Sequence, residues 1–183
     1  MRPMILAVLI APLFAQNEIP KTIEGSVART LDFVEGQFVS VAEAMPESKY
    51  GFIPTAGNFE GARSFGEQVK HVACSHVAFF NEMEGKAPPD GCEKGGPAKA
   101  ATKAELLQYL RDSFDYGNRV LAKMDARNAL SRVEGRYAGP NTRLGMAVTA
   151  VWHITDHYGQ LVEYLRMNGI VPPMTQKYGL TVR

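Results

Sequence analysis

Apolar residues recur at intervals of three and four along four segments of the chain. This spacing places them on one face of an α-helix. We therefore predict helices over residues 22–44, 64–84, 102–125 and 142–168. The apolar positions of the first segment are Ile23, Val27, Leu31, Val34, Phe38 and Val41. Those of the second segment are Phe65, Val69, Val72, Phe80 and Met83, with His76 in the same row.

The ends of these segments carry helix-capping signals. Ser64 with Glu67, and Thr102 with Glu105, match the capping box, in which the first residue and the acid three positions later bond to each other's backbone. The fourth segment stops at Gly169, and two prolines follow it. The helix starts are thus encoded locally.

The stretches between the helices are long and rich in glycine and proline. No segment alternates apolar and polar residues in the manner of a strand, and we find no internal repeat. Four helices of about 20 residues would each be about 30 Å long. The pattern therefore predicts an all-α fold, a four-helix bundle with long crossover loops.

Composition narrows the class of protein. A chain of 183 residues, 45% apolar and 21% charged, is typical of one soluble globular domain. The 20 lysines and arginines nearly balance 19 acidic residues. Without a basic surplus to pair with phosphates, we expect no nucleic-acid partner.

The first residues differ in character from the rest. Arg2 precedes an apolar run from Met4 to Phe14, and Ala15 ends it, in the order of a secretory signal peptide. The run is too short to span a bilayer. We expect a signal peptide at residues 1–16, one domain at residues 17–183, and a periplasmic or secreted protein with no membrane contact after cleavage. The alternative is an uncleaved apolar helix, since Leu13 suits the cleavage site poorly.

Two of the four histidines, His153 and His157, lie four residues apart in the last predicted helix. Both project from one face, and two imidazoles at this spacing can hold one divalent ion. The apolar stripe of this helix would be Leu144, Val148, Val151, Tyr158, Val162 and Leu165. The pair lies about 100° from the centre of that stripe. We expect it to line a different surface from the packing face.

The other two histidines, His71 and His76, are five apart, or about 140° around a helix, and cannot easily bind the same ion. His76 lies at the centre of its apolar stripe, so we interpret it as a hydrogen-bonded core residue. His71 lies off the stripe and could meet the pair in a side cleft. Periodicity alone does not distinguish such a cleft from open solvent.

The segments RSFGEQVKHVACSH and WHITDHYGQLVEYLRMNGIVPP resemble the DinB/YfiT-like family of metal-binding four-helix proteins. The resemblance covers nearly the whole chain after the signal peptide. It implies that His71, His153 and His157 bind one divalent metal ion, with zinc expected first and nickel or iron as alternatives, and that His76 is not a ligand. Histidines with a purely structural role remain the alternative.

The resemblance also implies a function. Some family members are thiol-dependent transferases or isomerases, and others are described as metal-dependent hydrolases. Three imidazoles leave coordination positions open, as in catalytic sites. Asp156 and Gln160 would either support the site or face solvent. We expect a small-molecule substrate whose identity the sequence does not give. The protein partner that we consider is a second copy of the chain, in a homodimer. The alternative function is non-enzymatic metal binding or a stress response.

The two cysteines, Cys74 and Cys92, are an even count in a chain expected to be exported. About 15 Å of helix separates Cys74 from the helix end, and eight loop residues can span up to about 27 Å. The loop could therefore fold back to form a disulfide. A buried thiol at Cys74 and a free thiol at Cys92 are the alternative.

Overall fold

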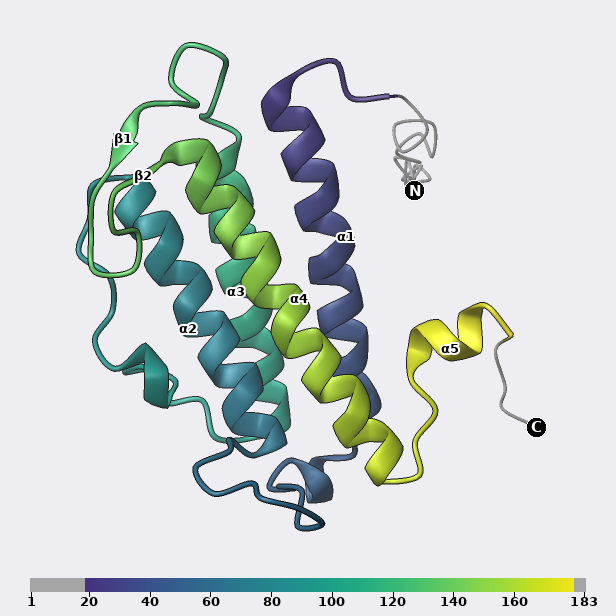
Figure 1. The fold of residues 1–183 in the computed structure, drawn as a ribbon. Helices are drawn as coiled ribbons and strands as arrows, with labels where there is room; N and C mark the ends of the chain where they lie inside the picture. Colours follow the sequence, from purple (N-terminus) through teal and green to yellow (C-terminus); the bar gives the residue numbers. More distant parts are fainter. Residues whose placement is uncertain (1–18, 180–183) are drawn as a thin grey trace, which may run out of the picture.

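The computed structural model describes residues 19–179, so the predicted signal peptide at residues 1–16 lies outside the described residues. Four long helices form a bundle (Figure 1): α1 (Ile23–Ala44), α2 (Phe65–Met83), α3 (Lys103–Leu121) and α4 (Arg143–Met167). Both α1 and α2 pack against α3 and α4, which places α1 and α2 at opposite corners. The predicted fold class is confirmed. Within the described range, no helix is long and apolar enough to cross a membrane.

The direction of the helices explains the long connections. Lys123 and Glu84 form an ion pair where α3 and α2 end, so these two helices run the same way. The chain must therefore return along the bundle between them, through residues 84–102, which include the short helix η3 (Cys92–Lys94). Figure 1 shows this return segment beside α2. It brings a loop residue next to the middle of α2.

The other two connections close the ends of the bundle. Residues 45–64 join the end of α1 to the start of α2 and contain the short helix η2 (Glu47–Lys49). Residues 122–142 lead from α3 to α4 and contain strands β1 (Arg132–Val133) and β2 (Asn141–Thr142), an antiparallel pair of two residues each. These strands are shorter than a sequence pattern can reveal. A last helix, α5 (Pro173–Lys177), begins at Pro173, where a missing N–H is tolerated.

The predicted helix starts are confirmed by their caps. Both bonds of the capping box form at Ser64 and at Thr102. Helix α3, however, ends at Leu121 and does not reach Asp125 as predicted. The side chain of Asp125 accepts hydrogen bonds from the backbone N–H groups of Arg127 and Asn128. Asp125 therefore begins the next turn and does not continue the helix.

The core confirms the predicted apolar stripe of α2 but corrects that of α4. Val148, assigned to the α4 stripe, is 55% exposed. The buried positions of α4 are Met146, Ala147, Ala150, Ile154, His157, Leu161, Tyr164 and Leu165. The prediction was wrong at Val148 and left out part of the buried face, while the other five stripe residues do pack against the core. The buried face is wider because α4 packs against both α1 and α2, where small residues such as Ala147 and Ala150 permit close contact. Large apolar residues alone do not locate such a face.

One polar pair lies inside the core. His76 and Glu35 are both buried, with His76 Nε2 3.4 Å from Glu35 Oε1, and Asn118 donates a hydrogen bond to the other carboxylate oxygen. Gly117 faces the His76 ring at a place where any β-carbon would collide with it. The predicted burial of His76 is confirmed. The predicted hydrogen bond is not formed, and the ring instead lies 3.4 Å from the carboxyl group of Glu35.

Burial sets the protonation of this pair. It raises the pKa of Glu35 to about 7, with further raising by the charges of Asp32 and Asp115 and some lowering by the Asn118 bond. Burial also lowers the pKa of His76 to about 3. At mildly acidic pH the carboxyl group is therefore protonated and the imidazole is neutral, so neither residue carries a charge.

The substitution Glu35→Gln tests this state. Because the folded pKa of Glu35 lies above the unfolded value of 4.5, the contribution of this carboxyl group to native stability is fully present below pH 4.5 and is lost as the pH rises through about 7. The Glu35→Gln variant does not lose this stability as the pH rises. In the wild type the loss amounts to about 1.4 kcal/mol for each unit by which the pKa of Glu35 is raised. Urea unfolding at pH 5 and pH 7.5 should therefore show a smaller decrease in stability for the variant than for the wild type.

The control for this experiment is Glu24→Gln in the first turn of the same helix. It should keep the wild-type difference in stability between the two pH values. Equal differences for the wild type and Glu35→Gln would contradict the raised pKa of the buried carboxyl group.

Candidate metal centre

Three histidines meet where α2 packs against α4. His71 comes from α2, and His153 and His157 come from consecutive turns of α4. Their ligand nitrogens all lie within 4.8 Å of one another, and Nε2 of His71 is 3.2 Å from Nε2 of His153. The structure therefore brings together the three residues named from the sequence. His76 lies apart from them, beside Glu35.

The position of the pair on α4 differs in part from the prediction. His157 is 7% exposed and lies among the buried residues of α4, so it belongs to the packing face. His153 is half-buried, and its ring packs against Phe79 with 5.3 Å between the ring centroids. The pair was placed off the packing face because the predicted α4 stripe covered only part of that face. His153 is the most accessible of the three imidazoles, so the group opens to solvent on its side.

Two oxygen acceptors fix the orientation of two rings. Nδ1 of His71 lies 2.6 Å from the carbonyl oxygen of Cys92, and Nδ1 of His157 lies 3.0 Å from Oε1 of Gln68. Because these oxygens only accept hydrogen bonds, each Nδ1 carries the proton. A neutral ring of this tautomer has its lone pair on Nε2, the nitrogen directed at the other histidines. Both rings are therefore set to act as ligands through Nε2.

The spacing of one pair of ligand nitrogens fits a tetrahedral ion, while the three together lie within 4.8 Å of one another. Zinc binds imidazole nitrogen at about 2.0–2.1 Å, and tetrahedral angles then separate two ligand nitrogens by about 3.3 Å. The Nε2 atoms of His71 and His153 are 3.2 Å apart. Three neutral imidazoles suit zinc, nickel or iron. The donor atoms therefore match the group that the family resemblance implies.

The surroundings keep all three rings neutral. Burial is the main cause, and it lowers the pKa of all three rings. The pKa of His153 falls to about 3 and that of His157 to about 4. The positive charge of Arg63 lowers all three further. The Cys92 hydrogen bond and the Glu93 charge partly raise the pKa of His71, and Asp156 partly raises that of His157. At neutral pH the rings are therefore uncharged, as metal binding requires.

The supporting residues were not predicted. Gln68 lies three residues before His71, and this helical spacing is a signal that the sequence contained. The Cys92 group is a backbone carbonyl, which no residue pattern identifies. The two residues considered for this role, Asp156 and Gln160, are exposed and hydrogen-bond to each other at 2.9 Å. Gln68 and Cys92 hold the imidazoles instead.

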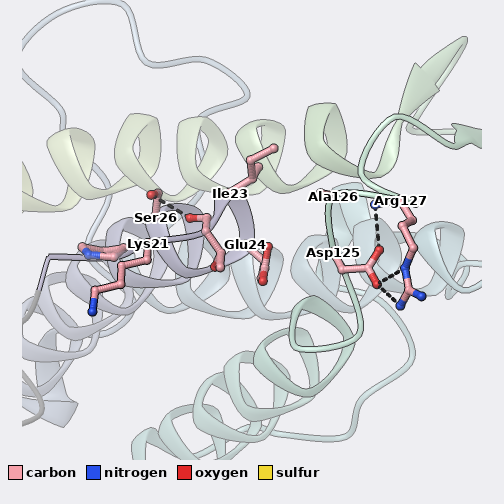
Figure 2. A pocket seen from close by; sticks show the side chains of 9 residues that line it. Lys21, Ile23, Glu24, Ser26, Asp125, Ala126 and Arg127 are labelled. Carbon is pink, nitrogen blue, oxygen red and sulfur yellow. Dashed lines mark hydrogen bonds and ion pairs between the residues drawn. The ribbon is translucent and has the colours of Figure 1, made fainter.

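A separate cavity of about 630 Å³ lies between the start of α1 and residues 125–127 (Figure 2). Several of its polar groups are paired with one another: both carboxylate oxygens of Asp125 accept hydrogen bonds from Arg127, and the Ser26 hydroxyl donates to the carbonyl of Thr22. None of the three histidines lines it. We assign no chemistry to this cavity.

A four-helix bundle with a histidine cluster between α2 and α4 defines a class of helical proteins. The chain belongs to the DinB superfamily, whose family model matches residues 30–161 and so includes all three histidines. The family resemblance drawn from the sequence is thereby confirmed. A comparison with curated proteins found no match.

Two solved structures share the fold. A DinB-like protein from Bacillus cereus has a TM-score of 0.67 at 14% identity, over 85% of this chain and 98% of that one. A conserved protein from Enterococcus faecalis has a TM-score of 0.62 at 17% identity, over 79% of this chain and 95% of that one. At these identities the likeness concerns the fold alone.

The tautomers can be measured in the metal-free protein. Long-range ¹H–¹⁵N NMR spectra at pH 7 should show the proton on Nδ1 of His71 and of His157, because each donates to an oxygen. The substitution Gln68→Ala removes the acceptor of His157 alone. It should change the His157 spectrum and leave that of His71 unchanged. A proton on Nε2 of His71 would contradict the contact with Cys92.

Proposed function

We propose that His71, His153 and His157 bind one divalent metal ion, with zinc as the best fit, and that the protein is a metal-dependent enzyme. The observation that carries the proposal is the convergence of the three ligand nitrogens, two of them oriented by their Nδ1 hydrogen bonds. A bound ion would supply a Lewis acid that lowers the pKa of a coordinated water or thiol. Three protein ligands leave room for such a group, as in catalytic zinc sites.

The chain's own residues would hold the ion and admit the substrate. The Cys92 carbonyl and Gln68 keep two rings in place, and the half-buried His153 marks the accessible side. Arg63 adds positive charge near all three imidazoles. The reaction types in question are hydrolysis and thiol-dependent transfer. An oxidising compartment favours hydrolysis, because small thiol cofactors are mainly found in reducing ones.

A second candidate function is metal binding without catalysis. It is supported by the composition of the cluster, which among the described residues contains three histidines and no carboxylate. Hydrolysis commonly uses a carboxylate or histidine as general base, and here all three imidazoles are engaged as ligands. A screen of ester and thiol substrates, with and without metal, separates the two. Turnover that disappears when the metal is removed would support the enzyme.

Metal affinity tests the ligand set. Protein purified without a histidine tag and stripped of metal should bind one zinc ion in a calorimetric titration. Alanine at His71, His153 or His157 should lower the affinity by more than about 100-fold, since even loss of a hydrogen bond to a ligand costs about 10- to 100-fold. The control is Asp156→Asn, an exposed change on the same helix, which should alter affinity little. Wild-type protein that binds no divalent ion would contradict the proposal.

The pH dependence of zinc binding follows from the lowered pKa values. Protons compete with the metal only where the rings become charged. Because burial lowers the pKa of His153 to about 3 and that of His157 to about 4, affinity should change little from pH 8 down to about 5 and fall below that. Titrations at several pH values measure this. A steep loss between pH 7 and 6 would indicate that the imidazoles titrate as exposed groups.

Export belongs to the same proposal. The signal-peptide pattern at residues 1–16 and the disulfide between Cys74 and Cys92 both support a periplasmic or secreted protein, since disulfides persist in oxidising compartments. In the native host, intact-mass measurement should find a mature chain that begins near Gln16 or Asn17. Val8→Asp, which interrupts the apolar run, should prevent processing. A wild-type protein that retains Met1 would contradict export.

A further inference from the structure

The return segment between α2 and α3 lies directly on α2. Gly95 and Gly96 both have positive φ, and a β-carbon on Gly95 would come within 2.8 Å of the Lys70 side chain. A β-carbon on Gly96 would collide with Sγ of Cys74. The chain therefore needs glycine here both for its backbone conformation and for its close approach to the helix.

One residue of this segment contacts two positions of α2. Cys92 is joined to Cys74 by a disulfide, with 5.2 Å between the Cα atoms, and its carbonyl oxygen accepts the hydrogen bond from His71 Nδ1. His71 and Cys74 are three residues apart, so they lie on the same side of the helix. Both cysteines are fully buried. The disulfide thus fixes the carbonyl opposite the imidazole.

The remaining contacts of this part of the segment are weaker. Arg63 donates two hydrogen bonds to the carbonyl of Glu93, at 2.7 and 3.1 Å. Arg136 and Tyr137 each approach the Glu93 carboxylate at 3.3 Å. All of these are exposed to solvent, where ion pairs and hydrogen bonds contribute little. The covalent link is the strongest restraint on the position of the Cys92 carbonyl.

We propose that the Cys74–Cys92 disulfide is a positioning element of the metal site, which acts by holding the Cys92 carbonyl against Nδ1 of His71. This inference rests on the proposed metal site. Without the disulfide the Cys92 carbonyl still accepts the Gly95 N–H at 2.9 Å within the return segment, but only exposed contacts then join this part of the segment to its surroundings. His71 therefore spends less time in the tautomer and orientation that present Nε2 to an ion. Loss of such an orienting group typically lowers metal affinity by about 10- to 100-fold.

The experiment compares the wild type with the double variant Cys74→Ala and Cys92→Ala. Zinc affinity in a calorimetric titration should fall about 10-fold or more, and the NMR signal of the His71 Nδ1 proton should weaken while that of His157 stays. Far-UV circular dichroism establishes that the variant is folded. Zinc bound with wild-type affinity by the variant would overturn the inference while leaving the proposed site intact.

A double-mutant cycle shows whether the effect passes through His71. In a His71→Ala background the cysteine replacements should change zinc affinity little, because the residue they act on is gone. In a His157→Ala background they should still lower it. Equal losses of zinc affinity in both backgrounds would overturn the inference. So would a double cysteine variant that is unfolded under conditions where the wild type is folded, since the disulfide would then stabilise the whole bundle.

A wild type that binds no zinc would instead contradict the proposed function, and the two failures are therefore distinguishable. Gln68→Ala is the matched comparison, because it removes the hydrogen-bond acceptor of His157 and leaves the disulfide in place. Its effect on affinity should add to that of the cysteine replacements, since the two act on different ligands.

Discussion

The burial of helix α2 on nearly all of its sides is the constraint on which the rest of the structure depends. Fifteen of its 19 residues are buried, because α3, α4 and the return segment all pack against it. Its polar residues must therefore find partners in three directions. His76 faces Glu35 in the core, His71 faces α4, and Cys74 faces the return segment. The site is a consequence of how this one helix is surrounded.

Burial gives its two histidines different chemistry by the same physical effect. In both cases desolvation lowers the pKa and favours the neutral ring. At His76 the neighbour is a carboxyl group that is itself neutralised by burial, so the result is an uncharged pair in the core. At His71 the neighbours are two further neutral imidazoles, so the result is a cluster of uncharged rings. The neighbours decide the role.

The sequence predicts the helices well because their caps and apolar spacing are local. It identifies His71, His153 and His157 through the family resemblance, since spacing alone cannot tell which helices adjoin. The buried face of α4 was missed in part because it depends on tertiary packing. For the same reason the sequence left the disulfide as one of two alternatives, and the structure shows that it forms. Glu35 was missed although a signal existed. It lies four residues after Leu31 and three before Phe38, a carboxyl group in the middle of an apolar stripe.

The contact between His71 and His153 explains how three imidazoles stay together without charge. Since His71 carries its proton on Nδ1, its Nε2 is an acceptor, and the proton in the 3.2 Å contact must belong to Nε2 of His153. That nitrogen cannot both keep this proton and bind an ion. Binding through Nε2 would therefore require the proton of His153 to move to Nδ1. His153 is the most exposed of the three residues, so the imidazole that would have to change its tautomer is the one nearest to solvent.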